Sequence, residues 1–206
     1  MDFIKTRDEL RRIYKTPEPT AGSIRKELKA LDHHCRSFIE RSPFVLIGSS
    51  DGAGSADVTP KGDRPGFAAI LDDTTIAIPD RPGNNRLDTL ENIVANPAVG
   101  LLFLIPGMNE TLRVNGEARI TLDASLRERL AVDGKPPLSV VVVHVKAAYM
   151  HCAKAFMRSQ LWSPESWLDR ATLPTLGAIL RDQLALAETA DATDKWLDES
   201  YRQTMW

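Results

Sequence analysis

Two arginines and two asparagines crowd a short polar segment that directly follows an apolar run. Residues 74–78 are rich in β-branched side chains and are predicted to form a strand that ends at Pro79. Arg81, Asn84, Asn85 and Arg86 follow at once, before a second apolar pattern begins. Free backbone N–H groups, a helix dipole and a guanidinium fork together favour a phosphate-sized anion. This segment is therefore a candidate anion site.

The element that must position these side chains is a helix that opens near Arg86. Apolar residues recur at helical spacing at Leu87, Leu90, Ile93 and Val94. Asn85 is a favourable N-cap, Asp88 suits the first turn, and Asn96-Pro97 closes the helix. The plain alternative is an ordinary capped helix with a solvated arginine.

Two further segments combine polar side chains with predicted strands. Asp57, Val58, Thr59, Pro60 and Lys61 bring a hydroxyl and a cation to a strand end before the glycine-containing loop 61–66. The alternative there is a solvated surface hairpin. Thr111 begins a strand directly after an apolar strand. The alternative to a functional role is an ordinary strand in which polar and apolar side chains alternate.

Several other kinds of chemistry find little support. The chain has no Gly-x-Gly-x-x-Gly and no Gly-x4-Gly-Lys-Ser/Thr, which argues against Rossmann and P-loop enzymes. The pairs His33-His34-Cys35 and His151-Cys152 lack zinc spacing, so no metal site is expected.

Composition describes an ordinary protein of one domain, residues 1–206. It is 43% hydrophobic and 26% charged, with net charge −2 and scattered basic residues, so neither nucleic acid nor a membrane is an expected partner. No apolar stretch reaches the ~20 residues of a membrane helix. The first residues lack the pattern of a signal peptide, and two cysteines make no disulfide framework, so a cytoplasmic location is expected.

The order of elements predicts a mainly β fold with flanking helices, an antiparallel barrel. Strands are expected at residues 44–48, 55–59, 67–71, 74–78, 98–105, 110–120 and 140–150. Besides the helix after Arg86, helices are expected at residues 6–14, 23–40, 123–130, 176–187 and 194–205, with a further helix start at Ser163-Pro164.

Taken together, these segments resemble the pyridoxamine 5′-phosphate oxidase-like superfamily of FMN-binding split barrels. The resemblance spans residues 42–160 as the barrel core and leaves residues 1–41 and 161–206 as flanking helices. Its most specific stretches are residues 57–63, 78–86 and 96–103, and the stretches around Asn84-Asn85 and His151-Cys152 look like a flavin-nucleotide-binding subgroup.

The resemblance implies FMN as the cofactor and a role for each matching position. The strand that lines the flavin falls on Asp57, Val58, Thr59 and Lys61, and the strand end at the ring falls on Ile78 and Pro79. The pair that holds the phosphate falls on Asn85 and Arg86, and the polar residue near the pyrimidine edge falls on Thr111.

The resemblance further implies a homodimer with the flavin between two subunits, acting on a small-molecule redox substrate. Where the true oxidase has an Arg-Lys pair for the phosphate, this chain has Asn85-Arg86. Where the flavin strand of the oxidase begins with an arginine, this chain has Ala56. Residues 126–137 lack the set that grips the substrate phosphate, so a true pyridoxamine-phosphate oxidase is not expected. A carrier that binds flavin without turnover, or a barrel for deazaflavin or haem, stays open.

The apolar strands at residues 98–105 and 140–145 bear on assembly. Polar and apolar side chains hardly alternate in them, which is typical of strands that are covered on both faces. The second cover must come from the terminal helices or from a partner subunit.

Overall fold

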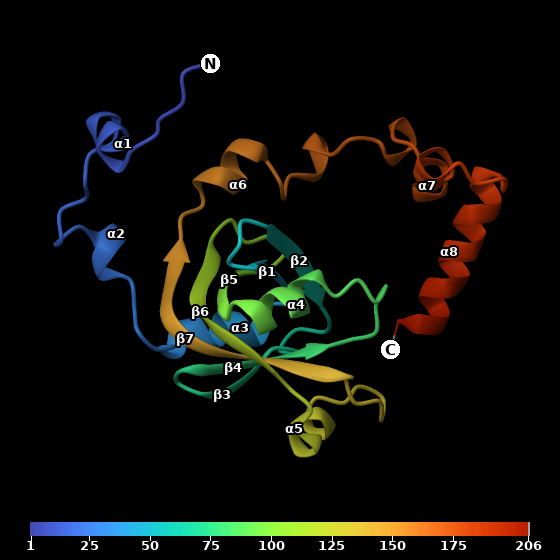
Figure 1. The fold of residues 1–206 in the computed structure, drawn as a ribbon, viewed down its shortest axis with the longest axis horizontal. Helices are drawn as coiled ribbons and strands as arrows, with labels where there is room; N and C mark the ends of the chain where they lie inside the picture. Colours follow the sequence, from blue (N-terminus) through green and yellow to red (C-terminus); the bar gives the residue numbers. More distant parts are fainter. Residues whose placement is uncertain (206) are drawn as a thin grey trace.

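A single antiparallel sheet of seven strands forms the body of the protein (Figure 1). The computed structural model describes residues 1–205. The strand order is β2-β1-β5-β6-β7-β4-β3, and the sheet curls into a split barrel with flanking helices, as the sequence predicts. The strands are β1 (Phe44–Ser50), β2 (Ala56–Gly62), β3 (Ala69–Asp72), β4 (Thr75–Asp80), β5 (Ala98–Leu104), β6 (Thr111–Thr121) and β7 (Ser139–His151).

Alternation along β1 and β5 decides which of their side chains fill the barrel. On β1, Val45 and Ile47 are fully buried, and their neighbours across the ladder, Phe103 and Leu101 on β5, are also buried. The intervening residues point to the outer face of the sheet. The barrel core is thus apolar, and the outer face is free to carry other functions.

Three helices close the barrel. The helix α3 (His33–Arg41) packs on β6 and β7, α4 (Asp88–Ala95) on β1, β2 and β6, and α5 (Ala124–Arg129) on β7. Of these, α4 matters most for the candidate site, because it begins directly after the polar segment that follows β4.

The single helix predicted for residues 23–40 is wrong. The structure has a short α2 (Gly22–Arg25) and then α3, separated by Leu28, whose N–H and C=O bond the backbone of Ala148 at 2.9 and 2.8 Å. Asp32 restarts the helix by accepting the Cys35 N–H at 2.8 Å, and this bond lowers the pKa of the Asp32 carboxyl. Pairing with a strand 120 residues away outweighs the local helical pattern.

Two local predictions near the candidate site also need correction. Strand β2 continues through Lys61 to Gly62, where the sequence suggested a loop. The helix α4 begins at Asp88, with Leu87 and not Asn85 at its N-cap. Asn84 Oδ1 accepts the Arg86 N–H at 3.0 Å, and this turn keeps Asn85 left-handed, with φ 55°, outside the helix.

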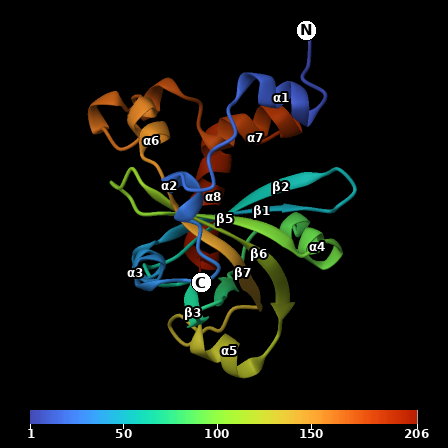
Figure 2. The same ribbon diagram turned by 90° about the vertical axis from the view of Figure 1, so that its left-hand side faces the viewer.

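The chain ends lie outside the barrel (Figures 1 and 2). They comprise α1 (Arg7–Ile13) with α2, then α6 (Lys154–Ser159), α7 (Leu176–Leu184) and α8 (Ala190–Thr204). The helix start predicted at Ser163-Pro164 is only a short 3-10 turn, Pro164–Ser166, and a second one spans Arg170–Thr172. Within the described residues, no helix is long and apolar enough to cross a bilayer.

Candidate functional site

Two ion pairs join the ends of strands that lie far apart in the sheet. Lys61 Nζ lies 2.6 Å from Asp80 Oδ1, and Arg81 Nε lies 2.9 Å from Asp63 Oδ2. Lys61 and Asp63 flank the last residue of β2, one edge strand, whereas Asp80 ends β4 near the opposite edge and Arg81 follows it. The pairs therefore bridge the split of the barrel.

Burial makes the Arg81 pair a structural tie. The Asp63 side chain is 1% exposed and that of Arg81 is 15% exposed. A buried guanidinium needs its carboxylate partner, because an unpaired buried charge is costly. The prediction that Arg81 offers its charge at the start of the helix is wrong in this respect, since a distant aspartate already holds it.

Arg86 has the opposite environment. Its side chain is 76% exposed and pairs with the Asp88 carboxylate two residues later. This hydrogen bond, aided by the charges of Asp88 and Asp57, raises the pKa of the guanidinium. Exposed ion pairs of this kind contribute little to stability, so Arg86 can exchange its partner for another anion.

The start of α4 provides donors beside Arg86. Among the described residues, no side chain caps this helix, because Leu87 occupies the N-cap. The first N–H groups of an α-helix have no partner within the helix, so an uncapped start presents donors to an anion. Thr89 in the first turn donates its hydroxyl to Asp57 Oδ2 at 2.6 Å, which fixes α4 against β2.

Strand β2 supplies a polar row that runs from α4 to the split. Asp57, Thr59 and Lys61 alternate onto one face and are half-buried, with Asp57 at the α4 end and Lys61 at the Asp80 end. Val58 points the other way and is 64% exposed on the outer face of the sheet. The residues predicted to line the flavin thus lie on two different faces of β2.

Ile78 and Pro79 can offer only backbone groups. Ile78 is fully buried in the core, and Pro79 is buried as well. Both pair with β7, opposite Val141 and Val140, whereas β3 pairs with β4 only as far as Ala77. The edge of β4 that continues to Asp80 therefore faces the split rather than another strand.

Thr111 does not join the other predicted residues within one chain. It lies at the start of β6, three strands from β2 in the sheet, or about 14 Å at the usual strand spacing. It is 2% exposed and alternates with Leu112, which points into the core. Within one chain, its hydroxyl therefore lies away from the split.

Sequence reasoning missed the acids that hold the cations. Asp63, Asp80 and Asp88 pair with Arg81, Lys61 and Arg86 respectively. Only Asp88 carries a local signal, two residues from its arginine. The other two pairs join residues 18 and 19 positions apart, and only the closed barrel brings them together.

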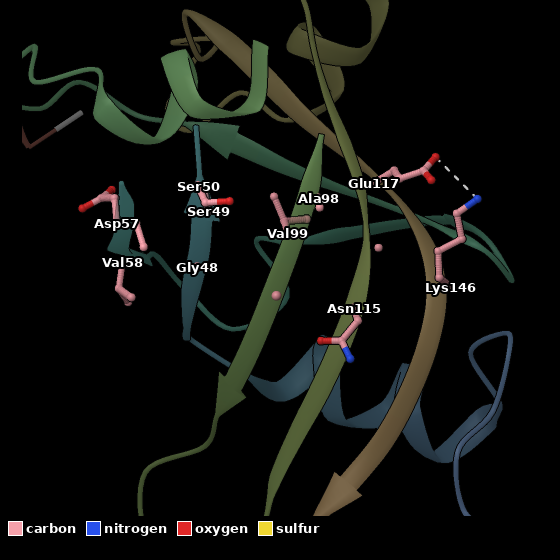
Figure 3. A pocket seen from close by; sticks show the side chains of 13 residues that line it. Gly48, Ser49, Ser50, Asp57, Val58, Ala98, Val99, Asn115, Glu117 and Lys146 are labelled. Carbon is pink, nitrogen blue, oxygen red and sulfur yellow. Dashed lines mark ion pairs between the residues drawn. The ribbon is translucent and has the colours of Figure 1, made fainter. Parts of the chain in front are cut away.

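A broad hollow lies on the outer sheet face rather than at the split. Its volume is about 610 Å³, and Gly48 and Gly100 leave its floor without side chains (Figure 3). Of the predicted residues, only Asp57 and Val58 line it, and Glu117 and Lys146 form an ion pair of 3.5 Å at its β7 side.

A smaller hollow of about 220 Å³ lies beside Arg81. Pro82 and the loop 135–138 before β7 line it. In the described part of the chain, no three His, Cys, Asp or Glu side chains gather as a metal site requires.

Comparison with solved structures finds several that are similar to this chain. They include HupZ from Group A Streptococcus (16% identity, 58% of this chain and 93% of that chain, TM-score 0.48) and a candidate pyridoxamine 5′-phosphate oxidase from Lactobacillus delbrueckii (18%, 60% and 98%, 0.47). An F420 reductase is also similar (19%, 56% and 94%, 0.41). No curated protein matches.

The family model for pyridoxamine 5′-phosphate oxidase gives the decisive match. It covers residues 31–152, more than half of the chain, from just before α3 to the end of β7. All seven strands and the split with its two ion pairs fall inside this range. The chain belongs to the pyridoxamine 5′-phosphate oxidase family.

Proposed function

We propose that this protein binds FMN in the split of the barrel and is a flavin-dependent oxidoreductase. The observation that carries the proposal is the joining of an uncapped helix start, an exposed arginine and the inner row of β2 at one place. A flavin mononucleotide needs an anion site at one end and a polar, half-buried wall along its length, and these residues supply both.

The phosphate end suits the residues around Arg86. The guanidinium is held only by an exposed carboxylate, and the N–H groups at the start of α4 are uncapped among the described residues. A phosphate can displace Asp88 and receive charge-assisted hydrogen bonds from both. Asn85 lies exposed next to Arg86 and adds an amide donor.

The ring end suits the region where β2 and β4 meet. Thr59 and Lys61 offer a hydroxyl and an ammonium from β2, and the backbone of Ile78 and Pro79 forms the opposite wall. In a homodimer, Thr111 of the partner subunit completes the site, which explains why this residue lies apart within one chain.

FMN, when bound, supplies the hydride and single-electron chemistry, so the protein needs no acid or base of its own. The residues of the chain bind the phosphate, orient the ring and exclude water. The buried Arg81–Asp63 pair keeps the two walls of the split at a fixed separation.

The outer face of the sheet supports the dimer. Phe44 and Val58 are exposed there, and Leu46, Leu102 and Leu104 are only half-buried. The described part of the terminal helices does not cover these strands (Figure 1). The sequence left open whether the terminal helices or a partner subunit cover these strands, and we propose that the partner subunit does.

Redox cycling separates an oxidoreductase from a carrier. The purified protein is loaded with FMN and mixed anaerobically with a reduced nicotinamide, and the flavin absorbance is followed before and after oxygen is admitted. We expect bleaching by the nicotinamide and recolouring by oxygen, both faster than for the same concentration of free FMN. Bound flavin that no nicotinamide reduces would favour the carrier.

A further inference from the structure

The C-terminal arm, residues 154–205, leaves the barrel without folding back onto the sheet. It starts at the end of β7, passes over one end of the barrel through α6 and α7, and descends as α8 on the side of segment 81–87 (Figure 1). Seen from the side, α1 and α7 both stand clear of the strands (Figure 2). The arm is therefore a long attachment rather than a cover for its own barrel.

The outer half of the arm is a helical hairpin that is held together by specific contacts. Asp194 Oδ1 on α8 accepts the Gly177 N–H of α7 at 2.7 Å. A Cβ at Gly177 would lie 2.5 Å from the carbonyl oxygen of Ala190, so only glycine permits this approach. The two helices thus hold each other in a defined shape, and α7 and α8 pack chiefly on one another.

This hairpin and the turns before it leave many large apolar side chains in water. Six of them are 50–75% exposed: Trp167, Leu168, Leu173, Leu184, Trp196 and Tyr201. Single exposed apolar residues are normal, but a series of this size along one segment marks an interaction surface. The arm is shaped to bury these side chains against something else.

The accessible surface of the whole chain shows the scale of what is uncovered. It is 13974 Å², whereas a compact monomer of 22.8 kDa has about 9,600 Å². The excess, about 4,400 Å², is larger than the roughly 2,500 Å² that each subunit covers even in a large permanent homodimer. Even an interface of that size would cover only part of the excess, so the arm calls for a partner that it contacts over a large area.

A second copy of this chain is the occupant that the structure favours. Each copy carries both an uncovered arm and an uncovered apolar sheet face around Phe44 and Val58. A two-fold arrangement satisfies both surfaces at once and closes on itself. The arm starts at the end of the sheet where Phe44 lies opposite Leu104, because Trp162 Nε1 donates to the carbonyl of Met108, in the turn between β5 and β6, at 2.7 Å.

We propose that the C-terminal arm is exchanged between subunits, so that α7 and α8 of each copy clasp the body of the partner over its outer sheet face. This inference rests on the homodimer proposed above and adds what holds it together. In the exchanged dimer the tryptophans and leucines of the arm become interface core. Loss of the arm contact then weakens the dimer without touching the residues of the split.

Site-specific photocrosslinking tests the exchange in the full chain. A benzoylphenylalanine replaces Trp196 on α8, and in a matched control it replaces the exposed Glu128 on α5. After irradiation at low protein concentration, denaturing electrophoresis separates single from double mass, and peptide mapping locates the attachment. We expect a covalent dimer from position 196, attached to β1, β2 or β5, and single chains from position 128.

The outcomes separate this inference from the proposed function. A non-covalent dimer by light scattering, with only intrachain crosslinks from position 196, overturns the exchange and leaves the homodimer standing. A monomer overturns both. In samples that remain dimeric, the FMN content tests the cofactor proposal separately, because neither substituted position lies at the split.

A substitution gives a second, independent measurement. Trp196→Glu in the full chain should raise the dimer dissociation constant at least tenfold, whereas Glu199→Gln on the same helix should leave it unchanged. Circular dichroism establishes that α8 stays helical in both variants. Equal dissociation constants for folded Trp196→Glu and the unaltered protein would contradict the proposal.

Discussion

At the scale of single residues, three cations near the split differ in how firmly they are held. Arg81 is tied to a buried carboxylate, Lys61 is half-buried beside Asp80, and Arg86 is mostly in water. Only the last can change partners at small cost. The proposed phosphate site therefore depends on Arg86 more than on the cations with which it shares the segment.

Arg86→Ala should weaken FMN binding by about 10- to 100-fold, because a charge-assisted hydrogen bond contributes roughly 1.5–3 kcal/mol. Arg119→Ala is the matched control, since Arg119 is an exposed arginine on β6 with no assigned role. Fluorescence titration of each variant with FMN gives the dissociation constants. Equal constants for the two variants would remove Arg86 from the site.

The sequence could predict the donors of the site but not their partners. The positions of Arg86 and Lys61 follow from local pattern, as does the positive end of a helix after β4. The buried carboxylate of Asp63 does not, because its arginine lies 18 residues away and only barrel closure brings them together. The prediction of Asn85 as the N-cap was wrong because asparagine is favoured in left-handed turns as well as at N-caps.

At the scale of elements, the Arg81–Asp63 pair fixes the end of β2 against the end of β4. Asp63→Ala leaves a mostly buried guanidinium unpaired and should lower the free energy of unfolding by about 3 kcal/mol. Asp88→Ala removes the partner of an exposed arginine and should lower the free energy of unfolding far less. Urea unfolding of both variants measures the difference, and similar losses would show that the pair is no structural tie.

The bulge between β6 and β7 sets another strict requirement. The register shifts at Asn115/Gly116, and a Cβ on Gly116 would overlap the carbonyl oxygen of His144. Gly116→Ala should therefore lower the melting temperature markedly, whereas Gly22→Ala, which meets nothing within 4 Å, should not. Thermal melts followed by circular dichroism decide this. An unchanged melting temperature for Gly116→Ala would mean that the strands can move apart at the bulge.

The elements themselves were predictable to different degrees for physical reasons. All seven strands follow from local signals such as apolar runs, β-branched runs, turns and alternation, which depend on near neighbours in the sequence. The break in residues 23–40 was missed because Leu28 joins Ala148 through a contact that no local pattern encodes. The terminal helices follow from their apolar spacing, but their distance from the barrel does not, because amphipathicity does not specify the surface that will cover a helix.

At the scale of the whole molecule, the family accounts for the barrel fold. Residues of this chain in the segment 126–137 bear on which substrates we expect it to bind. Arg127, in the segment that matches the family's substrate-phosphate set, donates its Nε–H to the carbonyl of Pro137 at 2.8 Å. This bond holds the guanidinium against the loop before β7. We therefore expect no paired cationic grip for a second phosphate in this segment.

The protein should consequently not oxidise pyridoxamine or pyridoxine phosphate. Binding a phosphorylated substrate next to the flavin requires a bidentate or paired cationic grip, which the segment 126–137 does not provide. Pyridoxal phosphate formation is measured with FMN-loaded protein and compared with free FMN. A rate well above that of free FMN would contradict this expectation.

The identity of the bound cofactor tests the account most directly. The protein is purified without added ligand, its absorption spectrum is recorded, and the molecule released by denaturation is identified by mass spectrometry. FMN in a ratio of one per chain, or uptake of added FMN to that ratio with the flavin absorption bands, is the predicted result. A colourless protein that takes up no FMN, or one that releases a deazaflavin or haem instead, would contradict the assignment of the split as an FMN site.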